Sequence, residues 1–220
     1  MTDKIKNKDL FATDDFDFAF FINRFEFPWE IVCNIKEFFA NFNVKNYNNY
    51  TEIEEGIFVS KNVKIHKNAT LIPPVIIGEN TEVRTGAYIR GNVIIGKNCV
   101  VGNSTELKNC VLLNNVQVPH YNYVGDSVLG NHSHLGAGAI CSNLKIDGKN
   151  VVVHGKENFN TNTRKFGAVL ADNAEVGCNS VLNPGTIIGK NTIVYPLTSL
   201  RGVYEENKIV KGSKNVIQKI

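Results

Sequence analysis

An aliphatic residue at every sixth position between residues 57 and 113 constrains the fold more than any other feature. This column comprises Val59, Ile65, Leu71, Ile77, Val83, Ile89, Ile95, Val101, Leu107 and Leu113. Four residues after each comes a small or β-branched residue: Val63, Ala69, Val75, Thr81, Ala87, Val93, Cys99, Thr105 and Val111. Helices repeat at about 3.6 residues and strands at 2, so a period of six fits neither. It predicts a solenoid of short strands and tight turns.

The repeat is interrupted and then resumes. The later aliphatic column comprises Leu170, Val176, Leu182, Ile188, Val194 and Leu200. The count slips near Pro119 and again between Val124 and Leu129, and a slip of this kind predicts a bulge or a site. The polar stretch 142–166 has no repeat. It predicts an extruded loop or small hairpin, and such insertions often line the binding face of a solenoid.

Two segments flank the predicted solenoid at 56–203. Residues 1–55 are rich in Phe and are expected to form a helical cap and a linker. Pro28 suits the first turn of a helix whose apolar residues, including Trp29, follow helical spacing. We expect the cap to shield the open strand edge of the first coil; a partner-binding or ligand-binding face is the alternative. The basic tail 204–220 is expected to pack on the last coil or on a neighbouring subunit.

Composition and charge narrow the classes of function. The net charge of +3 is small for 220 residues, which argues against general nucleic-acid binding and allows a local basic pocket. The five cysteines contain no CxxC pair, so neither a disulfide framework nor a zinc knuckle is predicted. The polar N-terminus resembles no signal peptide, and no apolar run reaches the roughly 18 residues that span a bilayer. A cytoplasmic protein without membrane partners is expected.

Several motifs carry a family resemblance. They are Arg90-Gly91-Asn92, the stretch 101–108, His120-Tyr121-Asn122-Tyr123-Val124-Gly125-Asp126, Leu135-Gly136-Ala137-Gly138 and Asn143. Together they resemble the acetyltransferase half of bacterial N-acetylglucosamine-1-phosphate uridyltransferase/glucosamine-1-phosphate acetyltransferase. They are also similar to the C-terminal half of archaeal sugar-1-phosphate nucleotidylyltransferases. The resemblance implies a mainly β fold, a left-handed parallel β-helix. The left hand comes from the resemblance alone, because parallel crossovers are normally right-handed.

The resemblance also implies a reaction, namely acetyl transfer from acetyl-CoA to the amine of an amino-sugar 1-phosphate, feeding nucleotide-sugar synthesis. His120 would be the general base, because an imidazole titrates near neutral pH, and Asn143 would position the amine or the thioester. The implied sugar-phosphate ligands are Arg90, Lys108, Tyr123 and Lys165. CoA would lie near Cys178 and Pro196. No metal is implied, and the family is trimeric, with each site between neighbouring prisms.

Departures from the family pattern leave alternatives open. His134 replaces a sugar-binding Asn, Leu144 replaces a Tyr, and Cys178 replaces a Ser on the CoA coil. The nucleotidyltransferase motif is missing from the sequence, so a separate nucleotidyltransferase is a possible partner. A non-catalytic trimeric module that binds sugar phosphates or that enzyme is one alternative. A zinc enzyme similar to γ-class carbonic anhydrases is another, although the spacing of His120, His132 and His134 fits that pattern poorly.

Overall fold

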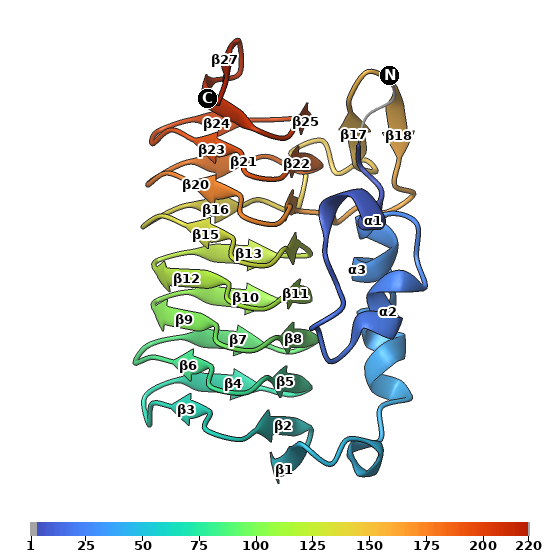
Figure 1. Ribbon diagram of the computed structural model, residues 1–220, viewed down its shortest axis with the longest axis vertical. Helices are drawn as coiled ribbons and strands as arrows, with labels where there is room; N and C mark the ends of the chain where they lie inside the picture. Colours follow the sequence, from blue (N-terminus) through green and yellow to red (C-terminus); the bar gives the residue numbers. More distant parts are fainter. Residues whose placement is uncertain (1–3, 220) are drawn as a thin grey trace.

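The computed structural model describes residues 4–219 and shows a three-walled β-solenoid with a helical layer along one side (Figure 1). Each turn of the chain contributes one short strand to each wall. Neighbouring strands in a wall are parallel and lie one coil apart, as in the pairing of Ile77 with Ile95. The predicted mainly β, parallel solenoid is confirmed.

The three walls are called A, B and C in the order in which the chain visits them. Wall A comprises β1 (Tyr50–Glu54), β2 (Ile57–Ser60), β5 (Val75–Ile77), β8 (Val93–Ile95), β11 (Cys110–Leu112), β14 (Val128–Leu129), β19 (Ala168–Leu170), β22 (Thr186–Ile188) and β25 (Val203–Tyr204). Wall B comprises β3 (Lys64–Ile65), β6 (Glu82–Val83), β9 (Val100–Asn103), β12 (Gln117–His120), β15 (His134–Leu135), β20 (Glu175–Val176), β23 (Ile193–Val194), β26 (Lys208–Gly212) and β27 (Asn215–Gln218). Wall C comprises β4 (Thr70–Ile72), β7 (Tyr88–Arg90), β10 (Glu106–Lys108), β13 (Tyr123–Gly125), β16 (Ile140–Cys141), β21 (Val181–Leu182) and β24 (Ser199–Leu200).

The interior of the prism is filled by the predicted aliphatic column. From Ile77 to Leu107 its members are fully or almost fully buried in one core, and so is the later column from Leu170 to Leu200. The prediction is wrong at Leu113 and Val111, which point out of wall A and are buried beneath the helices. Leu112 occupies the inner position instead, because it pairs with Ile95 after a coil of only 17 residues.

The irregular turns all fall at one corner of the prism, where wall C passes into wall A. Leu112 follows Leu107, and Leu129 follows Val124, after five residues instead of six. The long insertion between Cys141 and Leu170 leaves the prism at this same corner. Because Gln117, Val118 and His120 pair regularly with the previous coil, the predicted slip near Pro119 is wrong.

The helices cover wall A. They are α1 (Asn7–Leu10), α2 (Ala19–Asn23), α3 (Pro28–Ala40) and the 3-10 turn η1 (Val44–Asn46). In Figure 1 they run alongside the coils and not across their end. The outward side chains of wall A, such as Ile76, Ile94 and Val128, share one buried cluster with Phe18 and Ile31 of this layer. The expected shielding of the first coil's edge is therefore wrong, since β1 covers that edge by pairing antiparallel with β2.

The insertion and the C-terminus add two hairpins. Residues 142–166 contain β17 (Val152–His154) and β18 (Asn158–Asn160), which pair antiparallel and lie beside the helices (Figure 1). The tail continues the winding beyond 203, because β26 pairs parallel with β23 before β27 turns back on it. Among residues 4–219, the search for a helix long and apolar enough to cross a membrane finds none.

Candidate functional site

A buried carboxylate organises the irregular corner between walls C and A. Asp126 is 4% exposed and follows directly after β13. It accepts a hydrogen bond from Asn109 Nδ2 at 2.8 Å and a short hydrogen bond from Asn143 Nδ2. It also forms an ion pair with Lys108 Nζ at 3.3 Å. These groups stack because each lies about one coil from the next. A charge buried this deeply needs such partners, so Asp126 fixes the positions of both Lys108 and Asn143.

Wall C carries a second set of polar groups beside Asp126. Arg90 NH1 pairs with Glu106 Oε1 at 2.7 Å, and the Arg90 guanidinium lies 5.9 Å from the centre of the Tyr88 ring. Tyr123 follows Glu106 in register on the next coil. Burial raises the pKa of the Tyr123 hydroxyl, with further contributions from the nearby Glu106 and Asp126. Tyr123 is therefore a neutral hydrogen-bonding group at physiological pH.

Wall C thus presents Arg90 and Lys108 at its edge with wall A, whereas Glu106 and Tyr123 begin β10 and β13 at the other end of these short strands. Arg90 is exposed and Lys108 is half-buried, so a ligand from solution can reach both side chains. Arg and Lys side chains held in this way are the usual ligands of a phosphate group. Among the expected ligands, Lys108 and Asn143 share Asp126, and Arg90 and Tyr123 lie on the same wall beside Glu106.

His120 lies at the opposite edge of wall C, at the corner with wall B. It ends β12 and is exposed, and its backbone N–H donates to Asn122 Oδ1 at 3.2 Å. Tyr121 makes the corner turn with a φ of 51°. His120 is therefore on a regular turn. The slip that the six-residue count places beside it, near Pro119, does not occur. Only the three residues of β13 separate the His120 corner from Asp126.

The predicted CoA residues lie on the same corner as His120. The corner backbone forms a ladder in which Gly138 N–H donates to the His120 carbonyl, and Leu197 N–H donates to the Cys178 carbonyl. Cys178 is exposed, and so is Pro196 one coil later. The structure therefore arranges His120, Cys178 and Pro196 along one edge of the solenoid.

Of the remaining two predicted ligands, only His134 lies apart from these groups. His134 begins β15 and pairs with Gln117, so it lies on wall B, away from the Asp126 corner. Lys165 is exposed, and its backbone forms an isolated bridge with Leu144 where the insertion rejoins the prism. Lys165 is thus next in sequence to Phe166, whose N–H donates to the Asn143 carbonyl at 3.1 Å.

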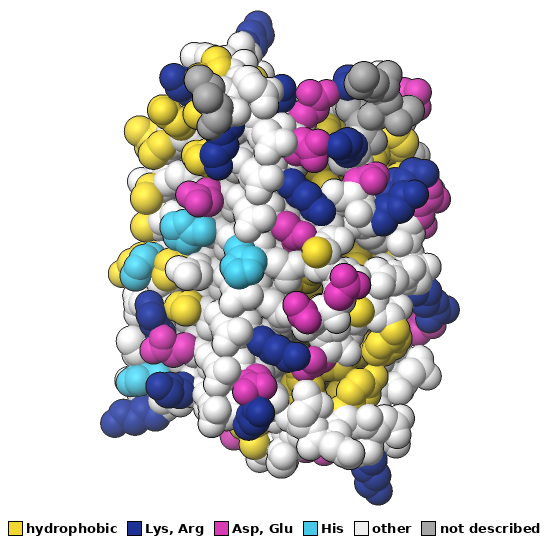
Figure 2. All heavy atoms as spheres, viewed as in Figure 1, with side chains coloured by type: hydrophobic (Ala, Val, Ile, Leu, Met, Phe, Trp, Pro, Cys, Tyr) yellow, Lys and Arg dark blue, Asp and Glu magenta, His cyan; other side chains and the backbone are white. Residues whose placement is uncertain are grey.

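The histidines of the zinc alternative are spread over wall B. His120 ends β12, whereas His134 pairs with the first residue of that strand and His132 contacts Asn115 at 3.4 Å. Figure 2 shows histidines gathered on the side away from the helices. Within residues 4–219, no group of three or more His, Cys, Asp or Glu side chains has a geometry that could hold a metal.

Asp126, Glu106 and Asn109 are the site residues that sequence reasoning missed. Asp126 was only part of a quoted motif, yet it lies 18 residues after Lys108 and 17 before Asn143. The spacing of one coil was therefore the signal that would have found it. Asn109 lies 17 residues before Asp126 and carries the same signal, whereas the donation from its Nδ2 to the carbonyl of Val32 in α3 joins distant parts of the chain and follows from no spacing.

Comparison with known proteins identifies relatives of this solenoid. Residues 71–163 match the family described as the GMPPB C-terminal domain. A bifunctional protein GlmU of Methanococcus aeolicus is 32% identical over 187 residues, which cover 77% of this chain and 46% of that protein. Over this range the chain is similar to the GlmU proteins. The resemblance to the acetyltransferase half of GlmU-like proteins, stated from sequence motifs, is confirmed.

Two further proteins are similar to this chain. A bifunctional sugar-1-phosphate nucleotidylyltransferase/acetyltransferase of Sulfurisphaera tokodaii is 30% identical over 163 residues, covering 64% of this chain and 40% of that protein. The GlmU-related chain spans about half the length of the curated relatives it matches. Among solved structures, PerB from Caulobacter crescentus, in complex with CoA and GDP-perosamine, has a TM-score of 0.43 and 18% identity, covering 72% of this chain and 57% of that one.

Proposed function

We propose that this chain is a CoA-dependent acetyltransferase that acetylates the amine of an amino-sugar 1-phosphate, with glucosamine 1-phosphate as the first candidate. The best structural support is that His120 lies at one edge of wall C and the cations Arg90 and Lys108 lie at the other, across strands of only three residues. A strand of three residues is about 10 Å long at 3.3 Å per residue. The phosphate on C1 and the amine on C2 of a 2-amino sugar lie closer together than this, so the long side chains of Arg90 and Lys108 would have to reach across part of the wall. A substrate lying across wall C would bring its phosphate to Arg90 and Lys108 and its amine toward His120.

The proposed reaction follows from these positions. The neutral amine attacks the thioester carbonyl of acetyl-CoA, and His120 accepts the proton that the nitrogen loses. The C–S bond then breaks, and the CoA sulfur leaves and takes up a proton. Cys178 and Pro196 are one and two coils beyond the glycine turn that follows His120, so CoA lying along this corner would present its thioester beside the imidazole. No metal is needed at any step.

The departures from the family pattern concern substrate identity. His134 and the exposed Leu144 stand where relatives are expected to have polar sugar ligands. We therefore propose amino-sugar 1-phosphates as the substrate class, with the configuration of the sugar to be found by testing a panel. The chain would supply its product to a nucleotidyltransferase.

The test is release of free CoA thiol from acetyl-CoA in the presence of amino-sugar 1-phosphates. We expect saturable turnover with at least one of them and a loss of about 10²–10⁴-fold in His120→Ala. His66→Ala is the matched control. His66 also lies where the chain leaves wall B, but it is three coils before His120. The activity of this variant should be unchanged.

Three outcomes would overturn the proposal. Turnover that survives in His120→Ala, with the fold intact by circular dichroism, would exclude His120 as the general base. Saturable binding of sugar phosphates without turnover of any of them would favour the non-catalytic module. Zinc bound in stoichiometric amount and required for activity would favour the zinc enzyme.

A further inference from the structure

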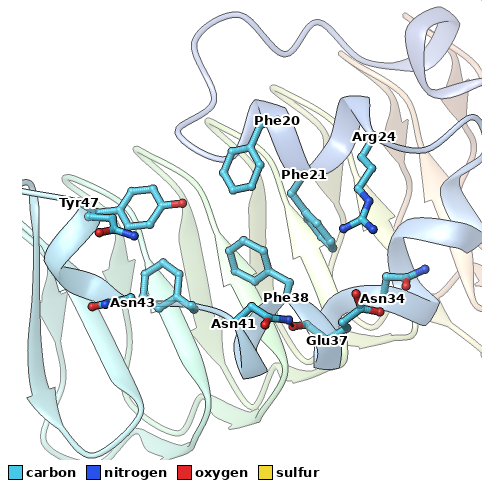
Figure 3. Close-up of a pocket in the computed structure, with 11 residues that line it drawn as sticks. Phe20, Phe21, Arg24, Asn34, Glu37, Phe38, Asn41, Asn43 and Tyr47 are labelled. Carbon is cyan, nitrogen blue, oxygen red and sulfur yellow. Dashed lines mark hydrogen bonds between the residues drawn. The ribbon is translucent and has the colours of Figure 1, made fainter.

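The helical layer contains a pocket that the proposed acetyl transfer does not use. It opens between α2, α3 and η1 and has a volume of about 190 Å³ (Figure 3). Five aromatic rings line it: Phe20, Phe21, Phe38, Phe42 and Tyr47. Arg24, Glu37 and four asparagines supply the polar part of its lining. The pocket is far from wall C, because α2 and α3 cover wall A.

The aromatic part of the pocket is rigid but incompletely covered. The Phe38 ring contacts Phe21, with ring centres 4.7 Å apart, and Phe42, with ring centres 5.6 Å apart. Phe38 is therefore packed against an aromatic ring on each side. Phe20, in contrast, is 58% exposed, with its ring 6.2 Å from that of Phe38. A large exposed ring beside a pre-formed pocket suits stacking by a planar ligand.

The polar part of the pocket combines groups of opposite charge. In Figure 3, the Arg24 side chain extends from the end of α2 toward Asn34 and Glu37 on α3. The Arg24 guanidinium lies 5.7 Å from the centre of the Phe25 ring, and within residues 4–219 it forms no ion pair. The Glu37 carboxylate likewise has no ion pair or side-chain hydrogen bond among the described residues. The two groups thus remain available to a ligand that offers both acceptors and donors.

Guanine is the base that satisfies this pair of groups. Its O6 and N7 accept from an arginine, and its N1–H and N2–H₂ donate to a carboxylate, which can only accept. Adenine offers one acceptor and one amino group on the same edge, so it would leave part of each charged group unpaired. We propose that the pocket between α2 and α3 binds the base of a guanine nucleotide by stacking on Phe20 and Phe38 and by hydrogen bonds to Arg24 and Glu37.

The test is isothermal titration of the full chain with GMP, IMP and AMP in the absence of CoA and sugar phosphate. It is independent of the proposed acetyl transfer, because it measures binding of a nucleotide alone. We expect GMP to bind at least tenfold more tightly than AMP. IMP, which lacks the N2 amino group, should lie between them, because one hydrogen bond to Glu37 is lost.

Variants locate the ligand. Glu37→Gln should abolish the preference for GMP over AMP, and Phe20→Ala should weaken both nucleotides about tenfold or more. Glu54→Gln, an exposed change of the same charge on β1, should leave binding unchanged. All three side chains lie outside the buried cores, and circular dichroism would confirm folding. Equal affinity for GMP and AMP, no saturable binding of GMP, or unchanged affinity in Glu37→Gln would overturn the proposal.

Discussion

At the residue scale, Asp126 is the centre of the candidate site because it is the buried group to which the other polar side chains attach. Its carboxylate holds Lys108 by an ion pair and Asn143 and Asn109 by hydrogen bonds. Without this carboxylate, the Lys108 ammonium would be free to move on its four-carbon side chain. Holding the Lys108 ammonium in place before the phosphate arrives lowers the entropy lost on binding. Asp126 therefore acts as a positioning residue.

We predict that Asp126→Asn raises the KM for the sugar phosphate at least tenfold, with a smaller change in kcat. The free energy of unfolding should fall by about 1–3 kcal/mol, because buried partners lose a charged acceptor. Steady-state kinetics and urea denaturation measure the two effects. Asp172→Asn is the matched control: Asp172 is equally buried and accepts from the backbone of Ala12 at 2.7 Å, far from wall C. It should lose stability without a change in KM.

The cysteines provide a prediction of reactivity. Burial raises the pKa of Cys99 and of Cys141 to about 12, and it raises the pKa of Cys110 as well. Cys33 and Cys178 are exposed. At pH 8 a thiol reagent should therefore modify Cys178 first and Cys33 more slowly, because partial burial raises the pKa of Cys33. The other three cysteines should react only after unfolding in guanidinium chloride. Rapid modification of all five in the folded protein would contradict the buried positions.

The same pKa shifts give a dependence of stability on pH. The folded state favours the neutral thiols, so their contribution is complete below the unfolded pKa of about 8.5. It is lost progressively as pH rises from there toward the folded value of about 12 for Cys99 and Cys141. The free energy of unfolding should therefore decline above pH 9, and Cys99→Ala with Cys141→Ala should reduce that decline.

At the scale of elements, α3 connects the helical layer to both the insertion and the site. Trp29 stacks on Phe27 at 4.6 Å and contacts Phe166 edge-on at 5.9 Å, just where the insertion returns to the prism. One turn further along α3, the carbonyl of Val32 accepts from Asn109. Loss of packing around Trp29 should therefore disturb the position of Asn109, which donates to Asp126.

We predict that Trp29→Ala lowers the free energy of unfolding by about 3–5 kcal/mol, because it removes a large buried ring. It should also increase proteolysis within residues 152–160, whose Phe159 lies 6.4 Å from the Trp29 ring. Circular dichroism melts and timed proteolysis measure these effects. Phe20→Ala should change stability by no more than about 0.5 kcal/mol, because this ring is largely exposed. Equal losses in the two variants would contradict the packing described.

At the scale of the whole molecule, the exposed apolar residues of walls B and C explain how copies of the chain would associate. Leu197 is 79% exposed, Tyr121 is 65% exposed and Tyr195 is 43% exposed, and all three lie at the corner that carries His120. Wall A has no comparable surface among the described residues, because the helices cover it. A trimer assembled through this corner would enclose His120 between neighbouring prisms.

We predict a mass in solution of three times the chain mass of 24.4 kDa by analytical ultracentrifugation. Leu197→Lys should reduce this to a single chain and abolish acetyl transfer, since it places a charge in the interface. Ile53→Lys, at a residue 51% exposed on β1, should leave the trimer intact. A fully active monomer in Leu197→Lys would show that one prism holds the complete site.

The sequence alone determined the solenoid, because a period of six brings the same kind of side chain to the interior on every coil. The family resemblance, and not the repeat, was the reason to expect Arg90, Lys108 and Asn143 in one site. The sequence did not determine the register at Leu112, where a coil one residue shorter reverses which side chains face inward. Only the tertiary structure placed the helices on wall A and centred the site on Asp126. Those positions depend on contacts between segments far apart in the chain, such as that of Asn109 with Val32, for which a local repeat carries no information.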